Sequence, residues 1–135
     1  MKSRDLLLMA LMYAATNFAW ADPPTLNTLL KEYAAQGAGK PDIQAGKRLW
    51  SKNFNGDKSF PERRCSMCHS KNLRQSGQHV RTKKVLKPMA PAVNPERLTS
   101  TRKVKKWLKR NCKWTLGREC TASEKANLLF FISQQ

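Results

Sequence analysis

Cys-Ser-Met-Cys-His at residues 65–69 is the group of side chains in this 135-residue chain whose types and spacing best fit a chemical role. In a C-x-x-C-H motif the two thiols can add across the vinyl groups of a haem, and the adjoining imidazole can bind the iron under the ring. We therefore predict that Cys65 and Cys68 attach one haem c covalently and that His69 is the proximal iron ligand.

Two other uses of a C-x-x-C pair fit the surrounding sequence less well. A structural zinc site needs a second Cys or His pair at ligand spacing, and a thioredoxin-like redox pair needs a βαβ context. The chain offers neither beside Cys65 and Cys68. Its length leaves room for one compact unit of roughly 100–150 residues, and an apolar macrocycle would supplement the modest core of such a unit.

The beginning of the chain has the pattern of an export signal. A short basic segment precedes an apolar run over residues 6–15, and residues 19–21 read Ala-Trp-Ala, a small-x-small cleavage sequence. The run falls short of the about 20 apolar residues that span a bilayer, and nothing later is apolar enough either. We predict a cleaved signal peptide at residues 1–21 and a soluble monohaem cytochrome c domain at residues 22–135, located in the periplasm.

Export also decides the state of the remaining cysteines. With Cys65 and Cys68 used for haem, Cys112 and Cys120 form one even pair in an oxidising compartment, where a disulfide is the expected state. The bridge closes a very short loop, so its entropic gain is below the roughly 3 kcal/mol expected for a loop of about 15 residues. We expect its main use to be holding the neighbouring Asn111 in place.

The charge of the chain is strongly positive. It carries 26 Lys and Arg against 9 Asp and Glu, a formal net charge of +17, and removal of Lys2, Arg4 and Asp5 with the signal leaves about +16. Such a field attracts acidic proteins, phospholipid head groups or nucleic acid, and charge alone does not choose among them. Many basic residues fall in segments that we expect near the haem edge, including Arg81, Lys83, Lys84, Lys87, Lys103, Lys105, Lys106 and Lys109.

Helices are the main elements available to position the motif. Residues 26–33 place leucines and a tyrosine at i, i+3, i+4 and i+7 of a helix. Residues 43–50 form a second helical pattern, with Asp42 placed to cap it and Gly46 allowing close approach of another helix. A capping-box sequence precedes a last helix that we predict over residues 122–133.

The segments between these helices lack helical periodicity. Residues 51–64 are rich in Asn, Gly, Asp, Ser and Pro, which predicts a loop leading into the motif. Prolines interrupt residues 76–95, which predicts an extended stretch that wraps around another group. Few segments alternate apolar and polar residues, so we expect a mainly α architecture.

The ligand opposite His69 decides the function, because a methionine or second histidine there keeps the iron closed, as in an ordinary electron carrier. The candidates are Met89, His79, Asn111 and the lysines. Met89 lies in an apolar loop, where a methionine commonly fills space. His79 lies in a basic, flexible stretch, where an exposed histidine is the ordinary state.

Asn111 is the candidate that the helical pattern singles out. It shares a predicted helix face with Val104, Trp107 and Leu108. We expect its amide to point toward the interior, where a polar group is costly without a partner, and a haem iron would be such a partner. The residues alone leave all these candidates open.

Several short motifs downstream of C-x-x-C-H resemble the sphaeroides haem protein family, also described under the DUF1924 domain. They are Ala90-Pro91, Asn94-Pro95, Val104-x-x-Trp107-Leu108, Arg110-Asn111-Cys112 and Gly117-Arg118-x-Cys120. The resemblance covers roughly Leu26 to the C-terminus. It implies a class I cytochrome c-like fold, all-α, in which short helices and loops wrap one covalent haem c.

The resemblance also implies roles for individual residues. Asn111 falls at the distal ligand of oxidised haem, which leaves the iron on reduction, and Cys112 and Cys120 fall at a disulfide. An amide oxygen is a hard, weak ligand that suits ferric iron better than ferrous iron, so an open ferrous site would accept O2, NO or CO. The implied partners are a dihaem cytochrome c and a membrane cytochrome b, and we expect the redox partner to be an acidic protein.

Three other functions compete with this gas-binding, electron-transferring cytochrome. A closed carrier would keep Met89 on the iron permanently. A basic exported protein that binds anionic polymers would use Trp50, Trp107 and Trp114 as a stacking surface, and we do not expect nucleic acid as the partner. An enzyme such as a peroxidase needs a distal acid-base group, for which only His79 or a lysine is present. We see no positioned catalytic pair and do not expect an enzyme.

Overall fold

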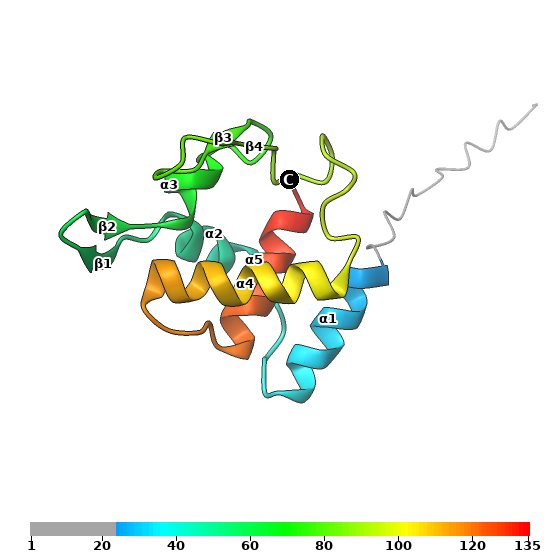
Figure 1. Cartoon of the computed structure of the whole chain (residues 1–135). Helices are drawn as coiled ribbons and strands as arrows, with labels where there is room; N and C mark the ends of the chain where they lie inside the picture. The colour runs from blue at the N-terminus through cyan, green and yellow to red at the C-terminus, as the bar shows by residue number, and fades with distance from the viewer. Residues whose placement is uncertain (1–23) are drawn as a thin grey trace, which may run out of the picture.

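The computed structural model describes residues 24–135, so the predicted signal peptide lies outside the described residues. Within them the chain forms five helices: α1 (Pro24–Ala35), α2 (Ile43–Ser51), α3 (Cys65–His69), α4 (Thr101–Leu116) and α5 (Ala122–Ser133). Two antiparallel hairpins complete the fold, β1 (Phe54–Asp57) with β2 (Phe60–Arg63) and β3 (Gly77–Gln78) with β4 (Val85–Leu86). The mainly helical architecture is thus as predicted (Figure 1).

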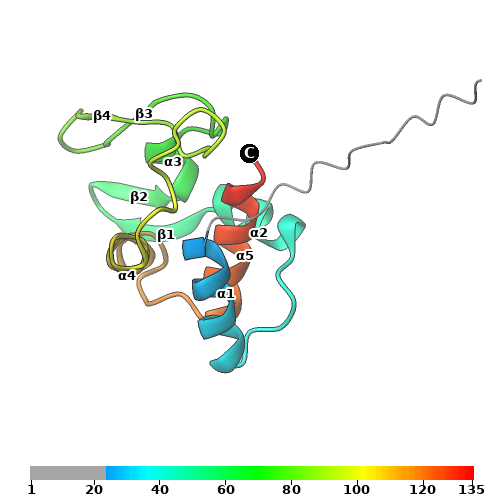
Figure 2. The same cartoon turned by 90° about the vertical axis from the view of Figure 1, so that its right-hand side faces the viewer.

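The helical core is built around α5. Its buried side chains surround the helix, which explains why α1 and α2 can both pack against it (Figure 2). The predicted apolar face of α1 is confirmed, since Leu26 and Leu29 are completely buried. The predicted start of α2 is also confirmed, because the Asp42 carboxylate accepts the backbone N–H groups of Gln44 and Ala45.

The crossing of α2 over α5 depends on Gly46, as the sequence predicted. A Cβ atom at this position would lie 2.6 Å from the Cβ of Phe131 and closer still to the carbonyl oxygen of Asn127. We expect Gly46→Ala to destabilise the fold by about 1–3 kcal/mol, because the two helices would have to separate. Urea unfolding followed by circular dichroism measures the loss.

Gly39→Ala is the matched control for this substitution. Apart from its chain neighbours, no atom of residues 24–135 lies within 4 Å of a Cβ atom built on Gly39, so the unfolding free energy of this variant should change by no more than about 0.5 kcal/mol. Equal stability of the two variants would contradict the close crossing.

The two loops predicted around the motif contain short hairpins instead. Phe54 pairs with Arg63 and Asp57 with Phe60, so residues 51–64 turn back on themselves immediately before the motif. None of the four residues in either strand is fully buried, and without a buried face the strands show no alternation of apolar and polar residues. In the predicted extended stretch, Gly77 pairs with Leu86.

α3, β3 and β4 lie together on one side of α4 in both views, and the α1–α2–α5 core lies on another (Figures 1 and 2). None of the helices within residues 24–135 is long and apolar enough to cross a membrane.

Candidate haem site

The C-x-x-C-H motif forms the short helix α3, which the β3 segment covers closely. Cys65 and Cys68 are free thiols on this helix. A Cβ atom on Gly77 would lie 2.9 Å from the Cα of His69, so only glycine allows the chain to pass this close. The Cys65 thiol is sheltered from solvent, and this burial raises its pKa to about 11, so the thiol is protonated at neutral pH.

His69, the last residue of α3, has the protonation state that an iron ligand needs. Burial, with the nearby positive charge of Arg97 and His79 as smaller causes, lowers its pKa to about 4. The imidazole is therefore neutral near pH 7 and keeps a lone pair for a metal. Its buried Nδ1 atom has no hydrogen-bond partner within residues 24–135.

Trp50 fixes the position of this imidazole from the core side. The two ring centroids lie 5.7 Å apart, and the indole Nε1 donates to the carbonyl of Ser70 at 3.1 Å. The backbone of Ser70 adopts a positive φ of 71 with ψ 155, and this conformation ends α3 directly after His69. Trp50 is a buried residue of α2, and its ring contacts Phe131 of α5. The helical core therefore orients the predicted proximal ligand.

The segment that carries Met89 lies on the α3 side of the site. The backbone N–H groups of Met89 and Ala90 both donate to the carbonyl of Leu73 at 2.9 Å. Arg97 holds the same segment by donating from Nε to the carbonyl of Pro88 at 2.8 Å. Met89 is half-buried against the hydrophobic core cluster, which is the packing role that the sequence suggested as its alternative.

The opposite wall of the site is α4, whose Ser100 cap accepts the N–H of Lys103. The face that carries Trp107 and Asn111 is not covered by other side chains of residues 24–135, since Trp107 is 51% exposed and Asn111 is exposed. The expectation of an inward-pointing Asn111 amide is therefore wrong for the protein part alone. Because Asn111 is exposed, its amide can bond to water, and its position carries no cost of burying an unpaired polar group.

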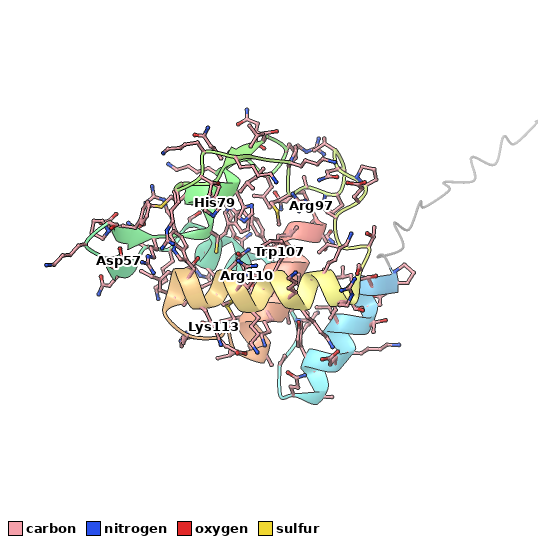
Figure 3. The ribbon with its side chains drawn as sticks, in the orientation of Figure 1. Asp57, His79, Arg97, Trp107, Arg110 and Lys113 are labelled. Carbon is pink, nitrogen blue, oxygen red and sulfur yellow. A yellow bond between two sulfur atoms is a disulfide. The ribbon has the colours of Figure 1, made fainter. Side chains whose placement is uncertain are left out.

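The direction of Asn111 follows from its neighbours one turn away. At about 100° per residue, it lies between the buried side of α4, marked by Leu108 and Thr115, and the side marked by Trp107 and Trp114. Trp114 points to the β1–β2 hairpin, where its ring meets Phe60 at 6.0 Å. Figure 3 places Arg110 on the edge of α4 nearer to His79 and Lys113 on the other edge.

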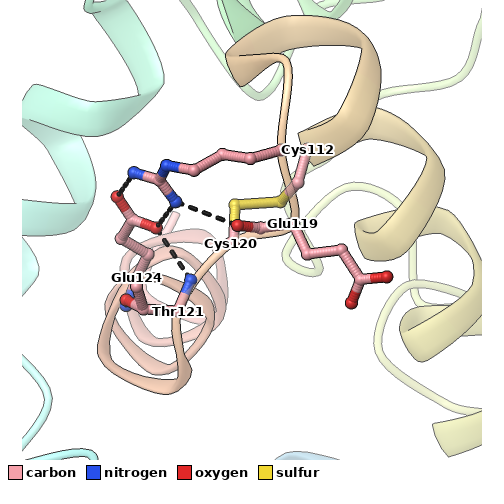
Figure 4. Close-up of a disulfide and its surroundings, with 6 residues drawn as sticks. Cys112, Glu119, Cys120, Thr121 and Glu124 are labelled. Atoms are coloured by element: carbon pink, nitrogen blue, oxygen red, sulfur yellow. Dashed lines mark hydrogen bonds and ion pairs between the residues drawn. A yellow bond between two sulfur atoms is a disulfide. The ribbon is translucent and has the colours of Figure 1, made fainter.

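A disulfide fixes the end of α4 immediately after Asn111. Cys112 is joined to Cys120 with an Sγ–Sγ distance of 2.02 Å, and both are buried. On the far side of the bridge Glu124 accepts the Thr121 N–H, as the predicted capping box requires, and pairs with Arg118 at 2.8 Å (Figure 4). The hydrogen bond from Arg118 is the largest of the causes that lower the pKa of Glu124.

These residues fit a covalently held haem. Two free thiols lie on one short helix, a buried and neutral imidazole follows them, and an exposed tryptophan face on α4 offers apolar surface for the ring. In that arrangement Cys65 and Cys68 would hold the haem, and His69 would ligate it from the α3 side. Of the sequence candidates, Met89 lies on the α3 side, and Asn111 lies on α4 together with several of the lysines.

Two site residues escaped the sequence analysis, Arg97 and Arg63. Arg97 is half-buried near His69, and Arg63 links the hairpin to α4 by donating to the Trp114 carbonyl at 2.8 Å. Both donate to backbone carbonyls outside their own local element, 9 residues away for Arg97 and 51 residues away for Arg63. No local sequence motif marks an arginine that acts in this way.

Known proteins match this chain over most of its length. The DUF1924 family, a domain of unknown function, matches residues 36–132. The cytochrome c-type protein SHP of Cereibacter sphaeroides is 37% identical over 107 residues, or 79% of this chain and 81% of that protein. Cytochrome c'' of Methylophilus methylotrophus is 35% identical over 92 residues, or 68% of this chain and 63% of that protein.

Solved structures of the same two proteins have a similar fold. Oxidised SHP, described as an oxygen-binding cytochrome c, has a TM-score of 0.75 at 34% identity, covering 85% of this chain and 100% of that one. Oxidised cytochrome c'' has a TM-score of 0.71 at 31% identity, covering 82% and 94%. Its solution structure, which addresses haem-ligand detachment, has a TM-score of 0.69 at 31% identity, covering 82% and 93%.

The fold and the likeness to these proteins define a monohaem c-type cytochrome with a class I cytochrome c-like fold. Its cofactor is covalently attached haem c. The chain belongs to the DUF1924 family.

Proposed function

We propose that this protein is a periplasmic cytochrome whose iron opens on reduction. Cys65 and Cys68 carry the haem, and His69 is the proximal ligand. Asn111 is the distal ligand in the ferric state and leaves the iron on reduction. With its sixth position free, ferrous haem c binds O2, NO or CO, and the protein exchanges electrons with redox partners.

The place of Asn111 on α4 carries this proposal. Asn111 is an exposed polar side chain on the α4 wall, bordered by the buried side of the helix and by the tryptophan side. The disulfide begins at the next residue and limits how far this turn of helix can shift. Met89, the main competitor, belongs to a segment tied to Leu73 on the α3 side.

The chemistry of an amide explains why the ligand would depend on the redox state. The amide oxygen of Asn111 is hard and neutral, so it binds ferric iron better than the softer ferrous ion. A thioether such as that of Met89 has the opposite preference and would keep the ferrous iron closed. The relatives support a distal ligand that leaves the iron, because SHP is described as oxygen-binding and cytochrome c'' was studied for haem-ligand detachment.

The charge distribution supports an acidic redox partner. Every Asp and Glu within residues 24–135 already lies in an ion pair with a Lys or Arg. Four basic residues of α4 have no such carboxylate partner: Arg102, Lys103, Lys106 and Arg110. We include a dihaem cytochrome c and a membrane cytochrome b among the candidate partners, with the protein exported by its signal at residues 1–21.

The test of this function is the absorption spectrum of the holoprotein, first ferric and then dithionite-reduced, with and without CO. We expect ferrous wild-type protein to be high-spin and to bind CO at once, because Asn111 has left. Asn111→Ala should shift the ferric spectrum from low-spin toward high-spin and leave the ferrous spectrum almost unchanged, since the side chain acts only in the oxidised state.

Met89→Leu is the companion variant, because it keeps the volume of the half-buried side chain. We expect it to leave both spectra as in the wild type. A ferrous wild-type form that is low-spin and inert to CO, together with a changed Met89→Leu spectrum, would show that the protein is a closed His/Met carrier.

A further inference from the structure

Arg63 makes three contacts that join two distant parts of the site. Its Nη1 atom donates to the backbone carbonyl of Trp114 at 2.8 Å, and its guanidinium lies 4.8 Å from the centroid of the Trp114 ring. Its Nη2 atom forms an ion pair with Asp57 across the β1–β2 hairpin. The Arg63 side chain is only 13% exposed, so its contacts with Trp114 are largely sheltered from water, whereas its partner Asp57 is exposed.

The carbonyl that Arg63 binds is one that helix geometry leaves without a partner. Trp114 lies in the last turn of α4, which ends at Leu116 and is followed by Gly117 in the left-handed conformation. Carbonyls in the last turn have no N–H four residues further along the helix, and they form its negative end. A guanidinium is well suited to this place because it supplies both the hydrogen bond and the positive charge.

The same contacts lie next to both predicted haem-bearing segments. Arg63 precedes Cys65 by two residues, at the end of β2. Trp114 follows Asn111 by three residues, so the two side chains lie on adjoining turns of one side of α4. Phe60 adds an edge contact to Trp114 at 6.0 Å. The hairpin thus contacts α4 at Trp114 and the disulfide holds it at Cys112, so both attachments lie within one helical turn after Asn111.

We propose that Arg63 is a positioning residue for Asn111. Arg63 ties the end of α4 to β2, the strand that directly precedes the C-x-x-C-H motif. It thereby sets the distance between the Asn111 amide and the motif that would hold the haem. This inference rests on the proposed function, because it assumes that Asn111 is the ferric ligand. A purely structural Arg63 would affect unfolding and leave the iron ligation of the folded protein as it is.

The experiment compares Arg63→Met with Arg64→Met in ferric holoprotein. Arg64 is the neighbouring arginine, and within residues 24–135 its side chain bonds to Asn53 and Glu62, both exposed. The fraction of high-spin iron, measured by electron paramagnetic resonance, reports how well Asn111 binds. Loss of a residue that orients a metal ligand typically costs about 10–100-fold in affinity. We expect Arg63→Met to weaken Asn111 ligation about tenfold, and Arg64→Met to leave it unchanged.

Two further variants separate position, charge and folding. Arg63→Lys keeps the positive charge and loses the planar fork, so it should resemble Arg63→Met rather than the wild type. Asp57→Asn can still accept the turn N–H groups of Ser59 and Phe60 while it loses the ion pair to Arg63. It should fold normally and show a smaller increase of high-spin iron in the same direction.

Asn111→Ala, measured beside these variants, tells the two possible failures apart. An unchanged ferric spectrum of Asn111→Ala would refute the ligand assignment itself. A changed Asn111→Ala spectrum with wild-type ligation in Arg63→Met and Asp57→Asn would overturn the role of Arg63 alone. A wild-type spectrum for Arg63→Lys would also overturn it, because charge and not geometry would then be sufficient.

Discussion

A double variant, Cys65→Ala with Cys68→Ala, is expected to contain no covalently bound haem, whereas the wild type should contain one haem per chain. Both thiols lie on the short helix α3 and are free. Without them no bond to the vinyl groups can form, and only ligation by His69 and apolar contact remain to hold the ring. The haem of this variant should therefore pass into acidified butanone, which does not extract a thioether-linked haem.

The chain supplies its own control for this result. Cys112→Ala with Cys120→Ala also removes two cysteines, but it removes the disulfide at the end of α4. That variant should keep its haem after acid extraction and on a denaturing gel stained for haem. Covalent haem in the Cys65 and Cys68 double variant, or its loss in the Cys112 and Cys120 variant, would refute the assignment of the two pairs.

The ends of several helices could be predicted because their signals are local. Asp42 caps α2 through two N–H groups only two and three residues away. Thr121 and Glu124 form their capping box within one turn. Apolar periodicity likewise gave the side of α1 that packs on α5. Each of these features depends on residues within about one or two helical turns, so one sequence contains the whole signal.

The β1–β2 hairpin and the link from Arg63 to α4 could not be predicted in this way. The hairpin strands lack a buried face, and the hydrogen bond from Arg63 to Trp114 spans 51 residues. Asn111 is an intermediate case. Periodicity placed it on the same side of α4 as Trp107, but it also predicted an inward amide, and both side chains are exposed within residues 24–135.

The second large effect concerns how fast electrons enter the protein. Electrostatic steering raises association rates by about 10–10³-fold, and it disappears when salt screens the charges. We expect reduction of the ferric protein by an acidic ferredoxin to be at least about tenfold faster in 10 mM salt, where the Debye length is about 30 Å, than in 1 M salt, where it is about 3 Å. Stopped-flow absorption at the haem band measures both rates.

Charge-reversal variants test whether the unpaired basic residues of α4 guide the encounter. Lys103→Glu with Lys106→Glu reverses two charges on α4 that form no ion pair with a carboxylate of residues 24–135. Lys31→Glu with Lys40→Glu changes the net charge equally, on α1 and the turn after it, away from α3 (Figure 1). We expect the α4 variant to lose most of the acceleration at low salt and the control to keep most of it. An equal loss in both variants would mean that the overall charge, and not the α4 face, attracts the partner.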